Sequence, residues 1–453
     1  MSKTFDPKAI SEFARYYGFH YDHIDPINLM TDVVIDMERG LAGQSSSLLM
    51  IPAYINPKIH VEPGKTVIAL DAGGTNLRSA LVKFDKNGKA VVGESMKVPM
   101  PGTTGRVSAE TFFDRIADVT VPLMEKSAEP VEGIGFCFSY SMEITKDADG
   151  ILLVFSKEVD APEVLGKAIG QGLREALGRR KVKAPERIVL LNDTAATLLS
   201  GLSEIPSHGG LRKGGDLYNV QPGPVVGLIL GTGFNTAYPE TQISKIGFDS
   251  PGNPQIVVCE SGNFAHRYMG PLDREYDKTT NSPGAYTLEK AAAGAYLGPI
   301  TFHFMKQAIR DGVIRFKKSD EFLSWPVMQT RDLDTFMHSP LAMEGPIGSL
   351  FDKDEKDALS CFAYLSSIVT ERGALLSAAV VAGAVERTKA GFDPLTPVRI
   401  AVEGTTFMVY KGLRSAFESW LHIMLNNGKP RSYSVTPVEQ ASLFGAAVAA
   451  LSK

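Results

Sequence analysis

The sequence predicts an α/β protein built as two lobes. The chain has 453 residues, whereas a single hydrophobic core stops growing near about 250–300 residues. Short apolar segments typical of strands alternate with amphipathic segments typical of helices, which indicates an α/β sheet architecture. An apolar strand followed by a Gly-Thr turn occurs three times, after Leu70, Leu230 and Val402. This recurrence favours two similar lobes whose turns face each other across a cleft.

Composition places the chain among globular proteins. Hydrophobic residues make up 44% and charged residues 22% of the chain, which supplies a large core. A net charge of −4 without a long basic block excludes a surface suited to nucleic acid or an anionic membrane. The three scattered cysteines, Cys137, Cys259 and Cys361, fit a reducing compartment. No signal segment or membrane span is apparent, so we expect a cytoplasmic protein, and the oligomeric state is unknown.

Two helices and a connector are predicted before the first sheet. Apolar residues recur at helical spacing over 7–19, and Asp25 with Pro26 is typical of the start of a second helix. Three prolines in the connector 48–63 exclude a long helix there. We expect residues 1–64 to pack on the larger lobe.

The small lobe is predicted over residues 65–200. Its first two strands form an antiparallel hairpin at 67–83, because two apolar runs flank a glycine turn. Helices and further strands then alternate, which indicates an α/β sheet with polar residues at strand ends. The remaining predicted elements are strands at 90–98, 133–139, 151–155 and 187–191, and helices at 111–126 and 165–177.

The large lobe is predicted over residues 201–435, and 436–453 forms a C-terminal helix that returns to the small lobe. An exposed loop is expected at 206–224, and a polar stretch at 273–281. The long apolar segment 353–389 is compatible with two helices and a break near Phe362. Strands are predicted at 225–230, 256–259, 398–403 and 433–435, and the other helices at 287–296, 298–311, 333–337, 412–425 and 442–451.

The turn after the first strand suits a metal-bound nucleotide. Gly73 and Gly74 let backbone N–H groups approach a ligand closely. Asp71 would be repelled by phosphates unless a divalent cation, bound directly or through water, neutralised the pair. The side chains that add donors for phosphate oxygens are Thr75, Asn76 and Arg78. The same residues are equally compatible with an ordinary Asp-x-Gly-Gly hairpin.

Two further turns repeat the Gly-Thr pair. Gly231-Thr232-Gly233 follows one strand and Gly404-Thr405 follows another. Each pair supplies backbone N–H groups and a hydroxyl, so turns from opposite lobes could grip the β- and γ-phosphates while a third meets the adenosine. Gly-Thr pairs also commonly end strands, and this alternative stays open for Gly404-Thr405.

The tripeptide Asn192-Asp193-Thr194 follows a strand and offers a candidate general base. Phosphoryl transfer passes through a loose transition state, so a positioned carboxylate can accept the proton of the attacking hydroxyl late in the reaction. Asp193 suits that role. An equally open alternative is that Asp193 caps the helix that follows.

A set of short polar side chains at strand ends and early helix positions suits a sugar. Each sugar hydroxyl both donates and accepts, so a pocket of carboxylates, amides and hydroxyls discriminates strongly. Taken singly, each residue is better explained as a solvated side chain or a cap, and the sugar interpretation depends on their number and on their alternation with the phosphate turns. The candidate set is Ser139, Ser156, Lys157, Asn192, Asn235, Glu260 and Glu289.

With these motifs in order, the sequence resembles the hexokinase family of the sugar kinase/actin/Hsp70 superfamily. Residues 70–78, Leu-Asp-Ala-Gly-Gly-Thr-Asn-Leu-Arg, are similar to that family's first phosphate loop, Leu-Asp-Leu-Gly-Gly-Thr-Asn-Phe-Arg. The matching segments, in chain order, are 45–52, 70–78, 191–194, 230–235, 282–290 and 296–298. The resemblance implies a two-lobed actin-like (ribonuclease H-like) fold whose interlobe cleft closes on sugar and excludes water.

The resemblance also implies roles for the candidate residues. Asp193 would be the base for the sugar 6-hydroxyl, and Lys157 would bind sugar near the reacting oxygen. Asp71 would hold Mg²⁺ through water. The implied phosphate and nucleoside contacts are Gly73, Gly74, Thr75, Asn76, Arg78, Gly231, Thr232, Gly233, Gly404, Thr405 and Ser442. We therefore predict an ATP- and Mg²⁺-dependent hexose kinase, with glucose as its first substrate.

Several segments depart from the family pattern. Ser-Phe-Pro becomes Ser139-Tyr140-Ser141, and Thr-Lys becomes Ser156-Lys157. The segment 260–266 and the nucleoside segment beginning at Glu403 also differ. These changes leave open a kinase for mannose, fructose or an amino sugar, and ATP is an expectation. A non-catalytic sugar sensor is the other alternative, disfavoured because Asp71, Lys157 and Asp193 are all present. An actin-like or chaperone-like ATPase would not explain the polar sugar set.

Overall fold

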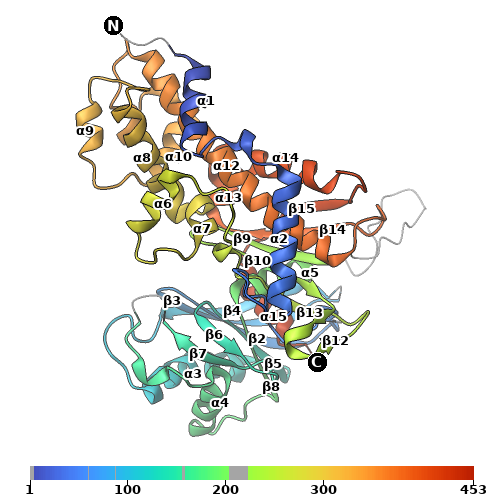
Figure 1. Ribbon diagram of the computed structural model, residues 1–453. Helices are drawn as coiled ribbons and strands as arrows, with labels where there is room; N and C mark the ends of the chain where they lie inside the picture. The colour runs from blue at the N-terminus through green and yellow to red at the C-terminus, as the bar shows by residue number, and fades with distance from the viewer. Residues whose placement is uncertain (1–4, 60, 87, 156–158, 204–222, 453) are drawn as a thin grey trace, which may run out of the picture.

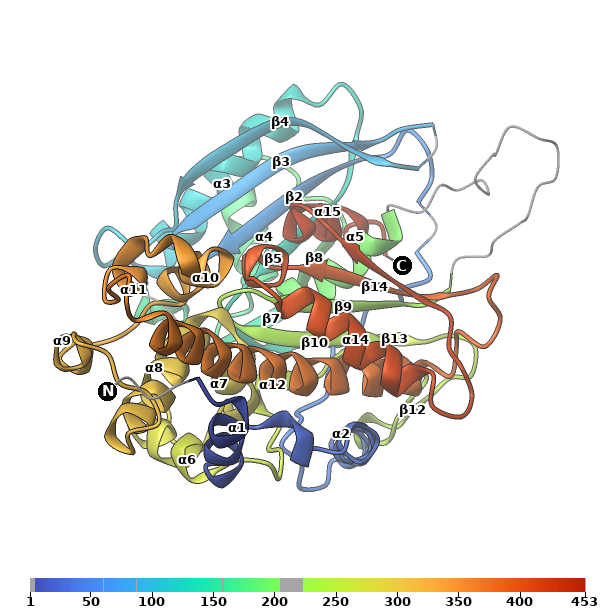
Figure 2. The same ribbon diagram turned by 90° about the horizontal axis from the view of Figure 1, so that it is seen from above.

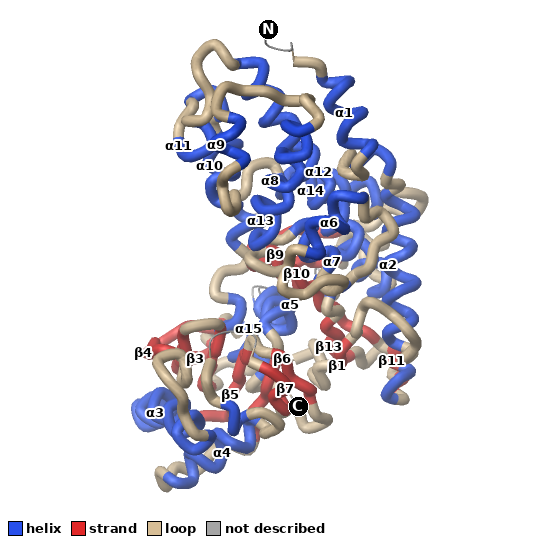
Figure 3. Tube along the Cα trace, turned by 60° about the vertical axis from the view of Figure 1, so that its left-hand side comes forward, coloured by secondary structure: helices blue, strands red, loops and turns tan. Residues whose placement is uncertain are grey.

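The chain forms two lobes, each organised around one sheet, with two helices between them. The computed structural model describes residues 5–59, 61–86, 88–155, 159–203 and 223–452. Figures 1 and 3 show helices α5 (Asp193–Ser203) and α15 (Ala441–Ala449) between the sheets. The predicted two-lobed α/β architecture is confirmed. The boundaries predicted at residues 64, 200 and 435 remain a prediction.

The small lobe contains a five-stranded sheet in the order β4-β3-β2-β5-β8. The predicted hairpin is confirmed, because β2 and β3 pair antiparallel from Thr66 opposite Lys83 to Gly73 opposite Asn76. Strands β5 and β8 continue the sheet in parallel, and β6 and β7 form a separate hairpin. The strands are β2 (Thr66–Gly73), β3 (Asn76–Phe84), β4 (Ala90–Pro99), β5 (Val131–Phe138), β6 (Ser141–Ile144), β7 (Gly150–Val154) and β8 (Arg187–Leu191).

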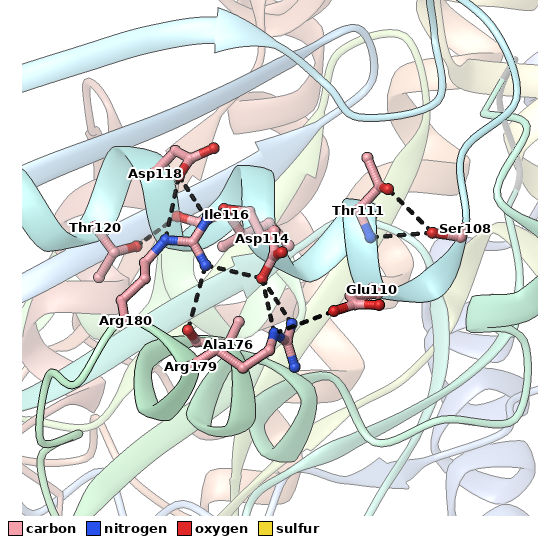
Figure 4. Close-up of polar contacts among 10 residues, drawn as sticks. All are labelled: Ser108, Glu110, Thr111, Asp114, Ile116, Asp118, Thr120, Ala176, Arg179 and Arg180. Carbon is pink, nitrogen blue, oxygen red and sulfur yellow. Dashed lines mark hydrogen bonds and ion pairs between the residues drawn. The ribbon is translucent and has the colours of Figure 1, made fainter.

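Helices α3 (Ala109–Lys126) and α4 (Ile169–Arg179) cover the outer face of this sheet. Figure 4 shows how ion pairs join the two helices at their solvent side. The guanidinium of Arg180 donates to both Asp114 and Asp118, and Arg179 also donates to Asp114. Because these side chains are partly exposed, each pair contributes at most about 1 kcal/mol, and the apolar layer beneath them holds the helices in place.

The large lobe contains a six-stranded sheet in the order β1-β13-β10-β9-β14-β15. Strands β9, β10 and β13 form an antiparallel meander, whereas β14 and β15 are parallel to β9. A small ribbon, β11 with β12, lies outside it. The strands are β1 (Ile51–Pro52), β9 (Val225–Leu230), β10 (Phe234–Glu240), β11 (Gln242–Ile243), β12 (Phe248–Asp249), β13 (Gln255–Val258), β14 (Val398–Glu403) and β15 (Tyr433–Pro437).

A single helix of 33 residues, α12 (Lys356–Thr388), runs through the large lobe. Figure 2 shows it along the sheet, with α1 (Pro7–Tyr16) and α2 (Pro26–Leu41) on its outer side. The break allowed near Phe362 does not occur, because that ring packs inside the core against other aromatic rings. The helix is long and apolar enough to cross a membrane by length and composition, but 94% of the relevant window is buried inside the protein.

Of the remaining helices, α7, α8 and α14 pack against α12. Helix α6 was not predicted, because its inward side carries Asp273 and Asp277, which are buried against partner cations. The loop predicted at 206–224 lies almost wholly outside the described residues. The helices are α6 (Pro271–Lys278), α7 (Thr287–Ala292), α8 (Gly294–Arg310), α9 (Ser319–Leu323), α10 (Thr330–His338), α11 (Gly345–Gly348), α13 (Thr405–Val409) and α14 (Leu413–Leu425). Short 3₁₀ turns are η1 (Tyr21–His23), η2 (Pro162–Val164), η3 (Ser244–Ile246), η4 (Ser261–Asn263) and η5 (Pro340–Ala342).

The apolar layer between the sheets is built around α5 and α15. Small side chains from both helices and from both sheets form one buried cluster there. Gly445 of α15 contacts the α5 backbone so closely that a Cβ atom would lie 2.0 Å from the carbonyl oxygen of Ala196. Both helix N-termini are therefore held at the junction of the lobes, where the candidate residues gather.

Candidate active site

The glycine turn of the small lobe presents its polar residues at the end of the β2–β3 hairpin. Gly74 adopts φ 66°, a conformation that favours glycine. Asp71 lies opposite Arg78 across the hairpin. The Asn76 side-chain amide donates to the Thr75 hydroxyl at 3.0 Å, and both Thr75 and Arg78 are exposed. The turn can therefore offer backbone and side-chain donors to an anion, and its role as a phosphate site remains a prediction.

The two other predicted turns contact each other in the large lobe. Gly404 has φ 141°, and a Cβ atom there would lie 2.3 Å from the carbonyl oxygen of Leu230. The carbonyl oxygen of Gly231 accepts hydrogen bonds from the Thr406 hydroxyl at 2.9 Å and from the Gly294 amide at 2.8 Å. The segments 231–233 and 404–405 thus form one unit at the carboxyl ends of β9 and β14.

The unit also explains a helix boundary that we predicted wrongly. The segment 287–296 is not one helix, because Ala293 adopts an extended conformation with ψ 158° between α7 and α8. Because of this break, the Gly294 amide donates to the carbonyl oxygen of Gly231 and the Ala295 amide donates to the carbonyl oxygen of Thr232. Helix α8 consequently begins directly against the second Gly-Thr turn.

Asn192 and Asp193 stand where β8 enters α5. The side-chain oxygen of Asn192 accepts a 2.7 Å hydrogen bond from the Thr194 amide, so Asn192 caps the helix. The alternative that Asp193 supplies the cap is therefore wrong. Asp193 occupies the first turn of α5 and accepts from the Thr194 hydroxyl at 3.3 Å. A carboxylate at this position is stabilised by the positive end of the helix.

Three predicted sugar residues converge in the large lobe. The Asn235 side-chain amide donates to Glu260 at 3.0 Å. The carboxylate of Glu289 accepts a 3.0 Å hydrogen bond from the Phe234 amide. Glu260 itself adopts φ 57°, an uncommon backbone conformation for a non-glycine residue that often occurs at functional sites. These side chains come from β10, the segment after β13, and α7.

The carboxylates of both lobes influence one another electrostatically. Burial raises the pKa of Glu260, and the charges of Asp193 and Glu289 raise it further, against the hydrogen bond from Asn235. Burial likewise raises the pKa of Glu289. Burial, followed by the charges of Asp193 and Asp71, raises the pKa of Glu403 to about 7. These couplings link the phosphate turn, the candidate base and the sugar set in one region.

Ser139 and Ser442 meet at a buried cysteine between the lobes. Burial raises the pKa of the Cys137 thiol well above its usual value, against hydrogen bonding with Ser442 and Ser139. The Ser139 amide also donates to the carbonyl oxygen of Ala72 at 3.1 Å. Ser139 is therefore attached to the first turn, and Ser442 lies near it on α15. The predicted residues Ser156 and Lys157 lie outside the described residues.

The structure adds residues that the motifs did not single out. The Thr406 hydroxyl joins two turns. The sequence feature that could have pointed to this residue is the Gly-Thr-Thr segment in which it stands. Glu403 accepts from the Ala441 amide of α15 at 3.2 Å and lies 3.5 Å from the Thr197 hydroxyl of α5. The Tyr140 hydroxyl donates to the carbonyl oxygen of Gly74 at 2.8 Å. None of these contacts follows from local sequence, because the partners lie far apart in the chain.

A divalent cation fits the donor chemistry only together with a nucleotide. Within the described ranges, no group of three or more His, Cys, Asp or Glu residues could hold a metal ion. Asp71 leans over the turn, its Oδ1 atom 3.6 Å from where a Cβ atom of Gly73 would stand. Mg²⁺ usually keeps several waters and binds one or two carboxylates plus substrate phosphates, so a single carboxylate beside a phosphate turn suits it.

Comparisons with known proteins agree with this arrangement. Family profiles described as hexokinase match residues 12–202 and 225–452. Hexokinase-1 of Arabidopsis thaliana is 29% identical over 470 residues, which cover 96% of this chain and 90% of that protein. Human hexokinase-3 is 28% identical over 388 residues, covering 83% of this chain and 40% of that protein. The chain thus spans about two fifths of the length of that human relative.

A solved structure shows the same fold. The hexokinase of Schistosoma mansoni, complexed with glucose, superposes with a TM-score of 0.73 at 20% sequence identity. The superposition covers 99% of this chain and 100% of the other. The two-lobed actin-like fold expected from the sequence is therefore confirmed.

Proposed function

The chain belongs to the hexokinase family, and on this premise we propose that it transfers the terminal phosphoryl group of ATP to the 6-hydroxyl of a hexose, with glucose as its first substrate. The observation that carries the proposal is the convergence of Asp193 with the sugar-type carboxylates and the Gly-Thr turns. Asp193 raises the pKa of both Glu260 and Glu403, which supports its place between the sugar and nucleotide residues.

In the proposed reaction, Asp193 accepts the proton of the 6-hydroxyl while that oxygen attacks phosphorus. The bond from the terminal phosphorus to the bridging oxygen of ATP breaks, and ADP leaves. Because the transition state is loose, positioning and charge stabilisation account for most of the rate enhancement. The cap that Asn192 places on α5 supports this role, since it orients the helix turn that carries Asp193.

The sugar would be held by hydroxyl, amide and carboxylate groups. Asn235 and Glu260 already form a hydrogen-bonded pair, and Glu289 is fixed by the Phe234 amide. Such a prearranged set pays less ordering entropy on binding. Ser139 would complete the set from the small lobe, with Ser156 and Lys157 contributing as the family resemblance implies.

The nucleotide would lie between the glycine turn of the small lobe and the joined turns of the large lobe. Mg²⁺, held by Asp71 through water, would neutralise the phosphates of ATP when bound. The exposed Thr75 and Arg78 side chains support phosphate contacts on one side. Thr232 and Thr405 would contribute from the other side. Catalysis would take place in the cytoplasm, and we expect no nucleic acid or membrane partner.

The test is a substrate panel with purified protein, ATP and Mg²⁺. Coupling to a dehydrogenase specific for glucose 6-phosphate reports the position of transfer, and ADP release measures mannose, fructose and glucosamine in parallel. We expect turnover with glucose and the highest kcat/KM for that sugar. A higher kcat/KM for another hexose would correct the substrate. Absence of sugar-dependent ADP release with every hexose would contradict the proposed kinase and favour a non-catalytic sugar-binding protein.

A further inference from the structure

We infer that Tyr140 is a positioning residue that fixes one peptide group of the phosphate turn and thereby sets affinity for the nucleotide. This inference deepens the proposed function and rests on it. Its basis is the 2.8 Å hydrogen bond from the Tyr140 hydroxyl to the carbonyl oxygen of Gly74. The two residues are 66 positions apart in the chain, and they follow β2 and β5, which are adjacent parallel strands of the small lobe.

The hydroxyl group determines which way the Gly74–Thr75 peptide faces. In a trans peptide group the C=O and N–H bonds point in opposite directions. When Tyr140 holds the carbonyl of Gly74, the amide of Thr75 must face the opposite side. Rotation of the Gly74–Thr75 peptide changes ψ of Gly74 and φ of Thr75, and glycine, which lacks a Cβ atom, tolerates a wide range of backbone conformations, so this peptide could otherwise rotate. Tyr140 therefore selects one of two orientations of a phosphate donor.

The tyrosine ring is itself held rigidly. It is 5% exposed and packs against Phe138, with ring centroids 4.8 Å apart, and against Phe155 at 5.2 Å. Burial raises the pKa of Tyr140 to about 12, so the hydroxyl keeps its proton and remains a donor throughout the physiological range. The donor thus has a fixed position and a constant protonation state.

The neighbouring residue extends the attachment. The amide of Ser139 donates to the carbonyl oxygen of Ala72 at 3.1 Å. Consecutive residues after β5 therefore bind the carbonyl groups of Ala72 and Gly74, on either side of Gly73. On the far side of the turn, the Met100 amide donates to the carbonyl oxygen of Thr75 at 2.8 Å. The carbonyl groups of Ala72 and Thr75 are thus held by backbone amides. The carbonyl group of the Gly74–Thr75 peptide, in contrast, is held by a side-chain hydroxyl.

The test compares Tyr140→Phe with the parent protein. Phenylalanine keeps the packed ring and removes only the hydroxyl. We expect the Kd for Mg-AMP-PNP, measured by calorimetry, and the KM for ATP to rise about threefold to tenfold, the range expected for one lost hydrogen bond. The Kd for hexose alone should stay within twofold, because the ring and Ser139 remain. Rotation of the turn peptide would also lower kcat.

The matched control is Tyr238→Phe, whose hydroxyl donates at 2.9 Å to Glu240 in the core of the large lobe. It should leave nucleotide affinity within twofold, whatever its effect on the melting temperature. Unchanged nucleotide affinity in Tyr140→Phe, an equal loss of hexose affinity, or the same nucleotide loss in the control would overturn the inference. Because calorimetry needs no turnover, a parent that binds nucleotide without phosphorylating sugar would refute the kinase proposal and still test this inference.

Discussion

The side-chain amide of Asn235 donates a 3.0 Å hydrogen bond to the carboxylate of Glu260. The amide oxygen of Asn235 accepts from the backbone amides of Thr236 and Ser261, so the orientation of the side chain is set from two sides. Glu260 is thereby held with its carboxylate near Asp193 and Glu289, whose charges raise its pKa. In the proposed function, the pair would be a prearranged contact for a sugar hydroxyl.

Replacing Glu260 by Gln should weaken sugar binding selectively. A hydrogen bond to a charged group contributes about 1.5–3 kcal/mol, so we expect the hexose KM to rise about 10- to 100-fold with the ATP KM within twofold. Steady-state kinetics with each substrate varied in turn measures both values. Glu418→Gln, on an exposed helix pair with Arg414, is the control and should behave as the parent. An unchanged hexose KM would remove Glu260 from the site.

Replacing Asp193 by Ala should abolish turnover while sugar binding is largely kept. A positioned general base contributes about 10²–10⁴-fold to the rate, and the emptied position also loses alignment of the hydroxyl. We expect kcat to fall by several orders of magnitude and the calorimetric Kd for hexose to change about threefold or less. Asp114→Ala, on the outer side of the small lobe, should keep the parental kcat. Near-normal activity of Asp193→Ala would refute the mechanism.

Glu403 should make the fold less stable as pH rises. The pKa of Glu403 is raised from 4.5 to about 7 by burial and by nearby carboxylates, so the folded chain holds this proton where the unfolded chain has released it. The contribution of Glu403 to the free energy of unfolding is therefore complete below about pH 4.5 and decreases as pH rises through 7. At about 1.4 kcal/mol per pKa unit, the loss is at most about 3.5 kcal/mol.

Denaturant titrations of the parent and Glu403→Gln at several pH values between 5 and 8 measure this contribution. Glutamine does not titrate, so the free energy of unfolding of the parent should fall relative to that of the variant as pH rises. A difference that is constant with pH would mean that Glu403 is not a proton-linked group in the fold.

Replacing Gly404 by Ala should disrupt the joined turns of the large lobe. A Cβ atom at this position meets the backbone of Leu230 at 2.3 Å, so the two turns must separate, and we expect the ATP KM to rise at least about tenfold if each turn contributes an ordinary hydrogen bond or more. Gly412→Ala is the matched control, because Gly412 has φ 84° but open space around its Cβ position. Its backbone strain, of order 1 kcal/mol, should lower stability without changing the ATP KM. Equal KM values for the two variants would contradict the steric explanation.

Replacing Asp273 by Ala should destabilise the large lobe. Arg372 is fully buried, donates to Asp273 through two 2.8 Å hydrogen bonds, and lies 3.9 Å from the ring centroid of Phe19. Removing one partner leaves a buried charge without compensation, which costs about 3–5 kcal/mol. Urea unfolding measures this loss. The control is Asp32→Ala, whose partner Arg267 is 61% exposed, and the expected change there is at most about 1 kcal/mol.

Local sequence was sufficient for much of the fold. The hairpin around Asp71 and Gly74 follows from two apolar runs and a glycine turn, which are properties of adjacent residues. The strand before Asn192 and the helix after it follow in the same way. The candidate roles came from motif order and residue chemistry, and they remain proposals even where Asn235, Glu260 and Glu289 converge.

Long-range packing decided the remainder. The extended Ala293 separates α7 from α8 because the following amides bind the turn at Gly231, and the first of these amides, that of Gly294, lies 63 positions after Gly231. The continuity of α12 at Phe362 and the buried acids of α6 depend on partners from other segments. The sequence alone therefore determined many of the strands, the glycine turns and the family pattern, whereas β10 (Phe234–Glu240) was not predicted. Only the tertiary structure decided the raised pKa of Glu403 and the Tyr140 contact with Gly74, because desolvation and hydrogen bonding depend on which distant residues become neighbours.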